Sequence, residues 1–250
     1  MKPVEVWYVR TDDVAGDELV RSCERVLAAE ELERCRAFFS RRDRHEHLVT
    51  RALARGVLGR ALDVPPASLS FCRNAFGRPE LKPSTDWRFN LTNTTALVAC
   101  AVARGREVGV DAEAVTRADE ILDVAHLVFT EGELERMAHL EAAARRQRAL
   151  ELWTAKEAYI KARGLGFSLS PTKIELDVRN DGIGLRFLED VGDDPTRWIV
   201  LARSIEEHVL ALCVERSGDG EDELFVRRAN LGELLRKRTG LPRASGVGGD

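Results

Sequence analysis

The sequence is poor in the residues that would place it outside the cell or in a membrane. Its cysteines are odd in number, scattered and without a C-x-x-C pair, at positions Cys23, Cys35, Cys72, Cys100 and Cys213. This pattern argues against a disulfide framework or a zinc site and predicts reduced thiols in a cytoplasmic protein. No apolar run is long enough to cross a bilayer, and no apolar core of a signal peptide precedes the strand-like segment 4–9.

Strong positive charge is also lacking. The formal net charge is −4, which argues against a general nucleic-acid binder. Arginines gather between residues 34 and 44, but acidic residues are interleaved, and neither an aromatic stacking pattern nor a known nucleic-acid motif accompanies them. A protein partner with an acidic helix would suit this segment equally well. We therefore expect neither nucleic acid nor a membrane among the partners.

Lysine is scarce, yet two lysines lie in one short segment, residues 153–161, with the sequence Trp-Thr-Ala-Lys-Glu-Ala-Tyr-Ile-Lys. The segment lies inside a long helical pattern, so Trp153, Glu157 and Lys161 share one face. A carboxylate one turn from an ammonium can hold a cation beside an anionic oxygen. The alternative is an exposed ion pair worth roughly a few tenths of a kcal/mol, and this segment alone leaves both open.

A second motif lies upstream at residues 108–113, Val-Gly-Val-Asp-Ala-Glu. Its alternation of apolar residues with Gly109, Asp111 and Glu113 predicts a strand with one apolar face. Asp111 and Glu113 then point to the same side, about 6.5–7 Å apart at the backbone. Two carboxylates at that spacing repel each other unless a cation lies between them, and a hard divalent ion prefers oxygen ligands. A solvated acidic pair at a strand end is the alternative.

The remaining patterns predict an α+β fold. Helices are expected at 17–37, 44–62, 117–128, 130–140 and 142–162, with a short helical stretch at 229–238. Strands are expected at 4–9, 69–73, 87–92, 96–103, 172–178, 183–188, 197–205 and 208–215.

These elements divide into two similar α+β halves, residues 1–114 and 115–216, although no internal sequence repeat is visible. The length of 250 residues allows one large domain or two small ones. Gly, Asp and Glu dominate from Ser217 onward. We therefore expect residues 217–250 to form a peripheral tail with disordered last residues.

Four segments in order resemble the Sfp-type 4′-phosphopantetheinyl transferases. Residues 76–79 (Phe-Gly-Arg-Pro) are similar to the family's G-[KR]-P loop, and residues 89–94 (Phe-Asn-Leu-Thr-Asn-Thr) to its F-N-[LI]-[ST]-H-[ST] segment. Residues 108–113 are similar to its (V/I)-G-(V/I)-D-x-E strand. The most specific resemblance is to the block F-[ST]-x-x-E…W-x-x-K-E-A-x-x-K-x-x-G-x-G, which spans residues 129–166. One position departs from the pattern, because Asn93 stands where the family usually has His.

The resemblance implies a pseudo-duplicated fold with the active site between the halves, and an Mg²⁺-dependent transferase. A serine hydroxyl of an apo acyl or peptidyl carrier protein would attack the β-phosphate of coenzyme A, and 3′,5′-ADP would leave. By position, Asp111, Glu113 and Glu157 are implied as ligands of Mg²⁺, or of Mn²⁺ in its place. Lys161 is implied as a phosphate-binding residue, and Glu157 is the candidate general base.

The resemblance also implies a set of coenzyme A contacts and a monomeric protein. The expected contacts are Arg42, Arg51, Arg78, Thr92, Asn93 and Lys161. Asparagine cannot carry the charge of His⁺, so Asn93 would offer a phosphate less charge complementarity. Two alternatives stay open. An Mg²⁺-dependent nucleotide pyrophosphate hydrolase would share the three carboxylates, and Asn93 suggests a non-catalytic relative that binds carrier proteins only.

Overall fold

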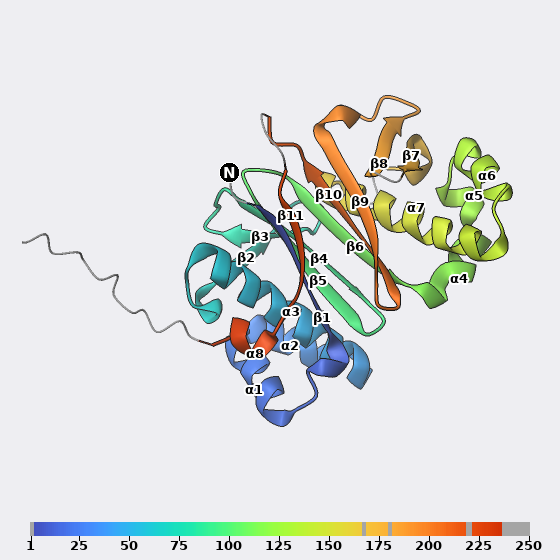
Figure 1. Ribbon diagram of the computed structural model, residues 1–250. Coiled ribbons are helices and arrows are strands. Elements are labelled where there is room, and N and C mark those ends of the chain that lie inside the picture. Colours follow the sequence, from blue (N-terminus) through green and yellow to red (C-terminus); the bar gives the residue numbers. More distant parts are fainter. Residues whose placement is uncertain (1–2, 167–168, 180–181, 219–221, 237–250) are drawn as a thin grey trace, which may run out of the picture.

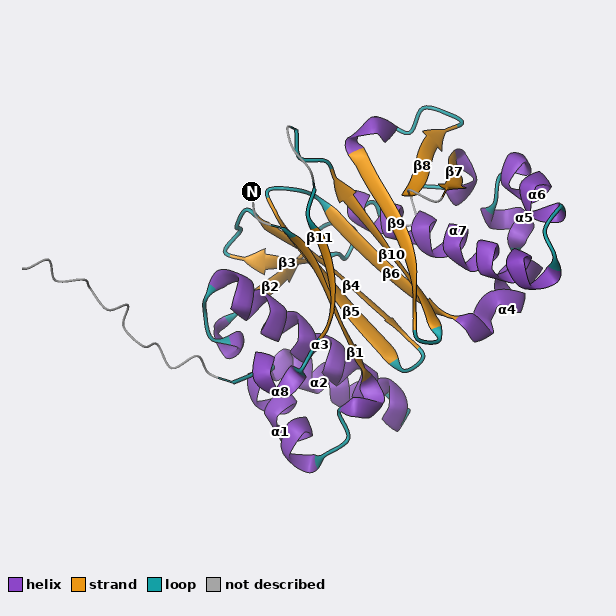
Figure 2. Cartoon of the chain, in the orientation of Figure 1, coloured by secondary structure: helices purple, strands orange, loops and turns teal. Residues whose placement is uncertain are grey.

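The computed structural model describes residues 3–166, 169–179, 182–218 and 222–236. Two sheets form its centre (Figures 1 and 2). The first has the order β11 (Leu224–Arg228), β1 (Val4–Arg10), β5 (Leu97–Arg104), β4 (Trp87–Thr94). The second has the order β6 (Val108–Ala114), β10 (His208–Glu215), β9 (Trp198–Ile205), β8 (Gly182–Phe187), β7 (Ile174–Arg179). A separate hairpin joins β2 (Ser70–Arg73) to β3 (Pro79–Lys82).

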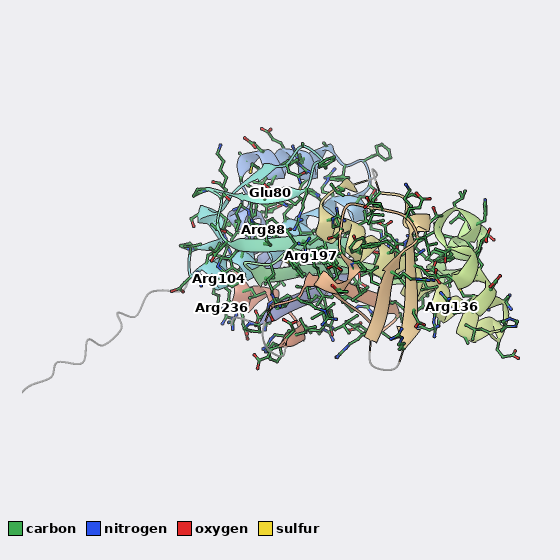
Figure 3. The ribbon with its side chains drawn as sticks, turned by 90° about the horizontal axis from the view of Figure 1, so that it is seen from above. Glu80, Arg88, Arg104, Arg136, Arg197 and Arg236 are labelled. Carbon is green, nitrogen blue, oxygen red and sulfur yellow. The ribbon has the colours of Figure 1, made fainter. Side chains whose placement is uncertain are left out.

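The helices cover the two outer sides of this pair of sheets (Figure 1). On the side of the first sheet lie α1 (Asp17–Val26), α2 (Ala29–Ala37), α3 (Arg41–Leu62) and α8 (Leu231–Leu234). On the side of the second lie α4 (Ala118–Asp123), α5 (Ala125–Val128), α6 (Glu131–Ala138) and α7 (Ala142–Arg163). Arg104 of β5 and Arg136 of α6 mark opposite sides of the molecule (Figure 3). The predicted α+β class with two α+β halves is confirmed.

The core has three apolar layers because successive side chains of β5 and β6 point to opposite faces of their sheets. Leu97, Ala99 and Ala101 of β5 pack with Val108 and Val110 of β6 in the layer between the sheets. The intervening β5 residues pack against α3. This two-sided burial explains why residues 96–103 are almost wholly apolar.

The C-terminal tail differs from the prediction. Residues 217–250 were expected to be peripheral, but β11 pairs with β1 in parallel, and Leu231 and Leu235 are buried against α3. The reason is that β1 would otherwise leave an open edge, which β11 covers. Residues 237–250, where disorder was predicted, lie outside the described residues.

Local geometry accounts for other differences. The helical pattern 17–37 is two helices, because Leu27 and Ala28 are extended and Ala28 N–H is capped by the Glu31 carboxylate. β6 precedes the predicted boundary at residue 114, yet its hydrogen bonds go to β10 of the second sheet. The division of the chain into domains remains a prediction.

Candidate active site

The two predicted motifs meet along one line of contact between β6 and α7. Gly109 lies against the α7 backbone: a Cβ at Gly109 would lie 2.1 Å from the Ala158 carbonyl oxygen and 2.4 Å from the Ala162 nitrogen. Farther along β6, Asp111 contacts Lys161, and Glu113 contacts Trp153. The predicted face of β6 therefore faces the predicted stripe of α7, with Glu157 one turn from both Trp153 and Lys161.

Asp111 is the centre of a small buried polar cluster. Lys161 Nζ lies 2.5 Å from Asp111 Oδ1, and Thr92 donates its hydroxyl to the same oxygen at 2.9 Å. Lys161 also donates to Thr92 Oγ1 at 3.3 Å. Asp111 Oδ2 is buried without a hydrogen-bond partner. One carboxylate oxygen is thus neutralised and the other remains available to a ligand.

Thr92 reaches Asp111 because β4 and β6 run side by side where the two sheets meet. Asn90 Oδ1 accepts a hydrogen bond from Val110 N–H at 3.0 Å, and Thr94 lies 3.4 Å from Glu113 Oε2. The ascending order of these pairs shows that β4 is parallel to β6. The site therefore combines residues from both halves of the chain.

Glu113 is held by cationic and neutral donors. Arg117 Nη1 lies 2.7 Å from Glu113 Oε1, and the Trp153 indole N–H donates to the same oxygen at 3.2 Å. Burial, followed by the charge of Asp111, nevertheless raises the pKa of Glu113 above its usual value. The sequence placed Trp153 on the same face as Glu157 and Lys161, but it did not identify Arg117 or Thr94 as partners of Glu113.

Glu157 shares the electrostatic environment of the other two carboxylates. Burial raises its pKa, and the charges of Asp111 and then Glu113 add to this effect, whereas Lys161 lowers it. The charges of Asp111 and Glu113 thus lie close enough to Glu157 to raise its pKa. Their mutual repulsion favours a bound cation or a bound proton.

The residues fit a hard cation, although the side chains require adjustment to hold one. Among the described residues, no group of three or more His, Cys, Asp or Glu side chains is already gathered for a metal ion. In this arrangement Lys161 and Arg117 occupy oxygens of Asp111 and Glu113. The unpartnered Asp111 Oδ2 and the all-oxygen donor set are what Mg²⁺ or Mn²⁺ requires.

The other lysine of the helix motif has a structural role. Lys156 is buried and donates to the Glu133 carboxylate at 2.6 Å and to two backbone carbonyl oxygens. Glu133 also forms a capping box with Thr130 at the start of α6. Lys156 therefore anchors α7 to α6 rather than contributing to the polar cluster.

Several expected coenzyme A contacts have protein partners elsewhere. Arg42 is exposed and pairs with Glu46 one turn along α3. Arg51 is largely buried and contacts Glu31 at 2.5 Å. Asn93 is exposed, since strand alternation turns it away from the buried Thr92 and Thr94.

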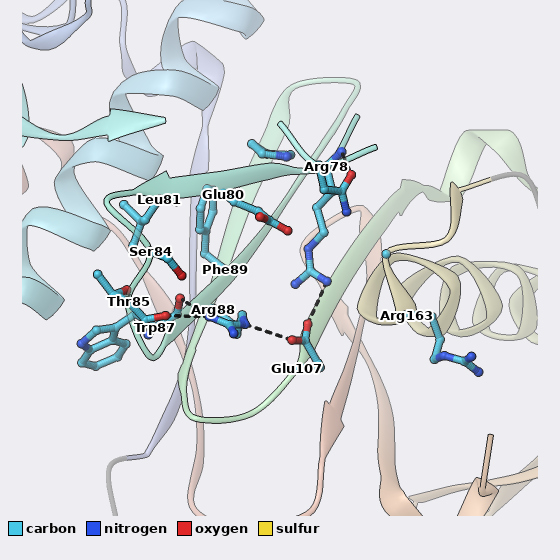
Figure 4. Close-up of a pocket in the computed structure, with 13 residues that line it drawn as sticks. Arg78, Glu80, Leu81, Ser84, Thr85, Trp87, Arg88, Phe89, Glu107 and Arg163 are labelled. Carbon is cyan, nitrogen blue, oxygen red and sulfur yellow. Dashed lines mark hydrogen bonds and ion pairs between the residues drawn. The ribbon is translucent and has the colours of Figure 1, made fainter. Parts of the chain in front are cut away.

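Arg78 is also engaged by the protein. Its guanidinium contacts Glu107, Ala162 and Val108. It lines a pocket of about 230 Å³ between the β2–β3 hairpin, β4 and the end of α7 (Figure 4). Of the six expected contacts, the structure brings only Thr92 and Lys161 to the carboxylates through hydrogen bonds among the described residues.

A basic cluster around His47 was missed by sequence reasoning. The Nε2 atom of His47 is buried without a hydrogen-bond partner. Burial lowers the pKa of His47, and so do the charges of Arg51, Arg34 and Arg73, while Glu31 raises it. Arginines from α2, α3 and β2 thus disfavour a positive charge on His47. Only the arginine-rich composition of residues 34–51 could have indicated this in advance.

No helix of the described segments is both long and apolar enough to span a membrane.

Comparisons with known proteins agree on one family. Residues 107–213 match the model of the 4′-phosphopantetheinyl transferase superfamily, and residues 17–104 match that of the 4′-phosphopantetheinyl transferase N-terminal region. A phosphopantetheinyl transferase of Thraustochytrium sp. is 30% identical over 245 residues, which cover 90% of this chain and 84% of the relative. A 4′-phosphopantetheinyl transferase of Bacillus subtilis is 28% identical over 187 residues, which cover 75% of this chain and 81% of the relative.

Among solved structures, a holo-(acyl-carrier-protein) synthase from Bacillus anthracis in complex with coenzyme A (3′,5′-ADP) has a TM-score of 0.38 and 24% identity. The match covers 45% of this chain and 96% of that one.

Proposed function

The chain belongs to the 4′-phosphopantetheinyl transferase family, and from this premise we propose how its own residues perform the transfer. The protein moves the 4′-phosphopantetheine arm of coenzyme A to a serine of an apo carrier protein and releases 3′,5′-ADP. The observation that supports the site assignment is the contact between β6 and α7, which aligns Asp111 with Lys161 and Glu113 with Trp153.

Lys161 provides a positive charge for the phosphate of coenzyme A. Its ammonium forms an ion pair with Asp111 in this structure. As a compact hydrogen-bond donor it suits a pyrophosphate oxygen of coenzyme A. The Thr92 hydroxyl lies beside it and offers a second donor. Together they orient the phosphate and stabilise charge that develops on it.

Glu157 is the proposed base. The serine Oγ forms a bond to the β-phosphorus, the bond from that phosphorus to the oxygen of 3′,5′-ADP breaks, and the serine proton passes to a Glu157 oxygen. In the metal-free protein, burial and then the charge of Asp111 raise the pKa of Glu157 above its usual value. Asp111, Glu113 and Glu157 would hold Mg²⁺ or Mn²⁺, which when bound neutralises the pyrophosphate.

The nucleotide phosphate of coenzyme A is proposed to bind near α3. His47 Nε2 is buried there without a hydrogen-bond partner, and Arg34, Arg51 and Arg73 supply positive charge around it. Arg42 and Asn93 remain candidate contacts from the sequence. We further propose a monomeric cytoplasmic protein, in keeping with its free cysteines.

The test is incubation with coenzyme A, Mg²⁺ and an apo carrier protein, followed by intact-mass measurement. The proposal expects one phosphopantetheine on the carrier serine for the wild type and none for Glu113→Ala or Glu157→Gln. Glu151→Gln is the matched control, because Glu151 lies on the same helix and pairs with Arg148. Consumption of coenzyme A without an acceptor would indicate a hydrolase, and carrier binding without transfer would indicate a non-catalytic relative.

A further inference from the structure

We propose that Arg78 is a positioning residue, which holds the end of α7, and with it Lys161, beside β6 by capping the C-terminus of α7 from the β2–β3 hairpin. The proposal rests on the transferase function given above. It replaces the expectation that Arg78 contacts the nucleotide.

The end of α7 needs a partner of this kind. The last four carbonyl groups of an α-helix accept no hydrogen bond from an N–H group within the helix. In α7, which ends at Arg163, these groups include the carbonyl of Ala162. Arg78 Nη1 donates to the carbonyl oxygen of Ala162 at 3.0 Å. A guanidinium at this end also complements the negative pole of the helix dipole.

Gly164 leaves the space that Arg78 occupies. Gly164 ends α7 in the left-handed conformation, with φ 64°. A Cβ at this position would lie 3.1 Å from Arg78 Nη1 and 3.3 Å from Arg78 Cδ. Glycine at position 164 therefore allows the left-handed turn that ends α7 and also leaves room for the Arg78 side chain.

The same guanidinium holds the start of β6. Arg78 Nη2 donates to the carbonyl oxygen of Val108 at 3.3 Å, and Nη1 donates to Glu107 Oε2 at 2.9 Å. Val108 lies three residues before Asp111, and Ala162 directly follows Lys161. Arg78 thus joins the two backbone segments whose separation sets the 2.5 Å contact between Lys161 and Asp111.

The geometry leaves Arg78 poorly suited to a phosphate. Its side chain is only 11% exposed. Both N–H groups of Nη1 are used, by Glu107 and Ala162. Figure 4 shows the guanidinium directed at Glu107.

Arg88 offers a matched control. It donates to the other oxygen of Glu107 at 2.9 Å and lines the same pocket. Its remaining hydrogen bonds go to the carbonyl oxygens of Thr85 and Trp87, which belong to β4 and the loop before it. Arg88→Met removes the same charge from the same carboxylate without releasing α7.

Two measurements on Arg78→Met and Arg88→Met test the proposal. In the transfer assay, Arg78→Met is expected to lower kcat by about tenfold or more while KM for coenzyme A stays within about twofold. In hydrogen–deuterium exchange, amides of residues 159–164 are expected to exchange faster in Arg78→Met only. Arg88→Met should match the wild type in both.

A raised KM with unchanged kcat in Arg78→Met would overturn the proposal in favour of a nucleotide contact. Equal exchange in the two variants would overturn it as well. If Arg78→Met fails to fold, Arg78→Lys replaces it, since a lysine keeps the charge near Glu107 but cannot span three acceptors; wild-type kcat in that variant refutes the cap. A wild type without transfer activity would reject the proposed function, while the exchange data would still decide the role of Arg78.

Discussion

Replacing Gly109 by alanine tests the contact that aligns β6 with α7. The backbone of Gly109 lies outside the left-handed region, so an alanine there would cause no backbone strain. Glycine is needed at this position only because there is no space for a Cβ atom. The added Cβ would lie 2.1 Å, 2.4 Å and 2.9 Å from backbone atoms of Ala158 and Ala162. Backbone atoms cannot rotate away, so α7 must move from β6 by roughly 1 Å.

This displacement has two measurable consequences. Overpacking of this severity costs about 3 kcal/mol, which corresponds to a Tm lower by about 6–12 °C in a protein of this size. The contacts of Lys161 with Asp111 and of Trp153 with Glu113 lengthen together, and a 1 Å misplacement lowers kcat by about 10²-fold.

The assay is the rate of phosphopantetheine transfer at a temperature where circular dichroism shows the variant to be folded. Gly218→Ala is the control, because a Cβ at Gly218 meets nothing within 4 Å. A folded Gly109→Ala protein with kcat within about twofold of the wild type would refute the argument that this contact aligns the site.

Three further predictions concern charges at and near the site. Glu157→Gln should raise the Tm of the metal-free protein near neutral pH: the folded state raises the pKa of Glu157, so its carboxylate destabilises the fold once the pH exceeds the unfolded pKa. The gain should vanish in acid, where both side chains are neutral, and a lower Tm at neutral pH would contradict the assigned repulsion. Arg117→Gln should tighten Mn²⁺ binding measured by calorimetry, because Arg117 competes for Glu113 Oε1; unchanged or weaker binding would show that Arg117 does not compete. Asn93→His should lower KM for coenzyme A in the transfer assay by restoring a chargeable donor, and an unchanged or higher KM would mean that residue 93 does not contact the phosphate.

The local part of the site could be predicted from the sequence because it depends on periodicity. Alternation in residues 108–113 placed Gly109, Asp111 and Glu113 on one face, and the helical repeat placed Trp153 and Lys161 on another. The structure brings these faces together.

The missing parts depend on partners that are distant in sequence. Arg78 contacts Ala162 across 84 residues, and β11 pairs with β1 at the opposite end of the chain. Arg51 was expected to contact coenzyme A, but α2 brings Glu31 against it. Periodicity identifies a face but not its partner, so these contacts have no local signature.

The most direct measurement of the central claim is an anomalous difference map from crystals grown with Mn²⁺ and coenzyme A. We expect a peak coordinated by Asp111 Oδ2 and by carboxylate oxygens of Glu113 and Glu157, with Lys161 moved from Asp111 to the pyrophosphate. Coenzyme A bound with its pyrophosphate away from these three carboxylates, or a peak at another position, would contradict the account.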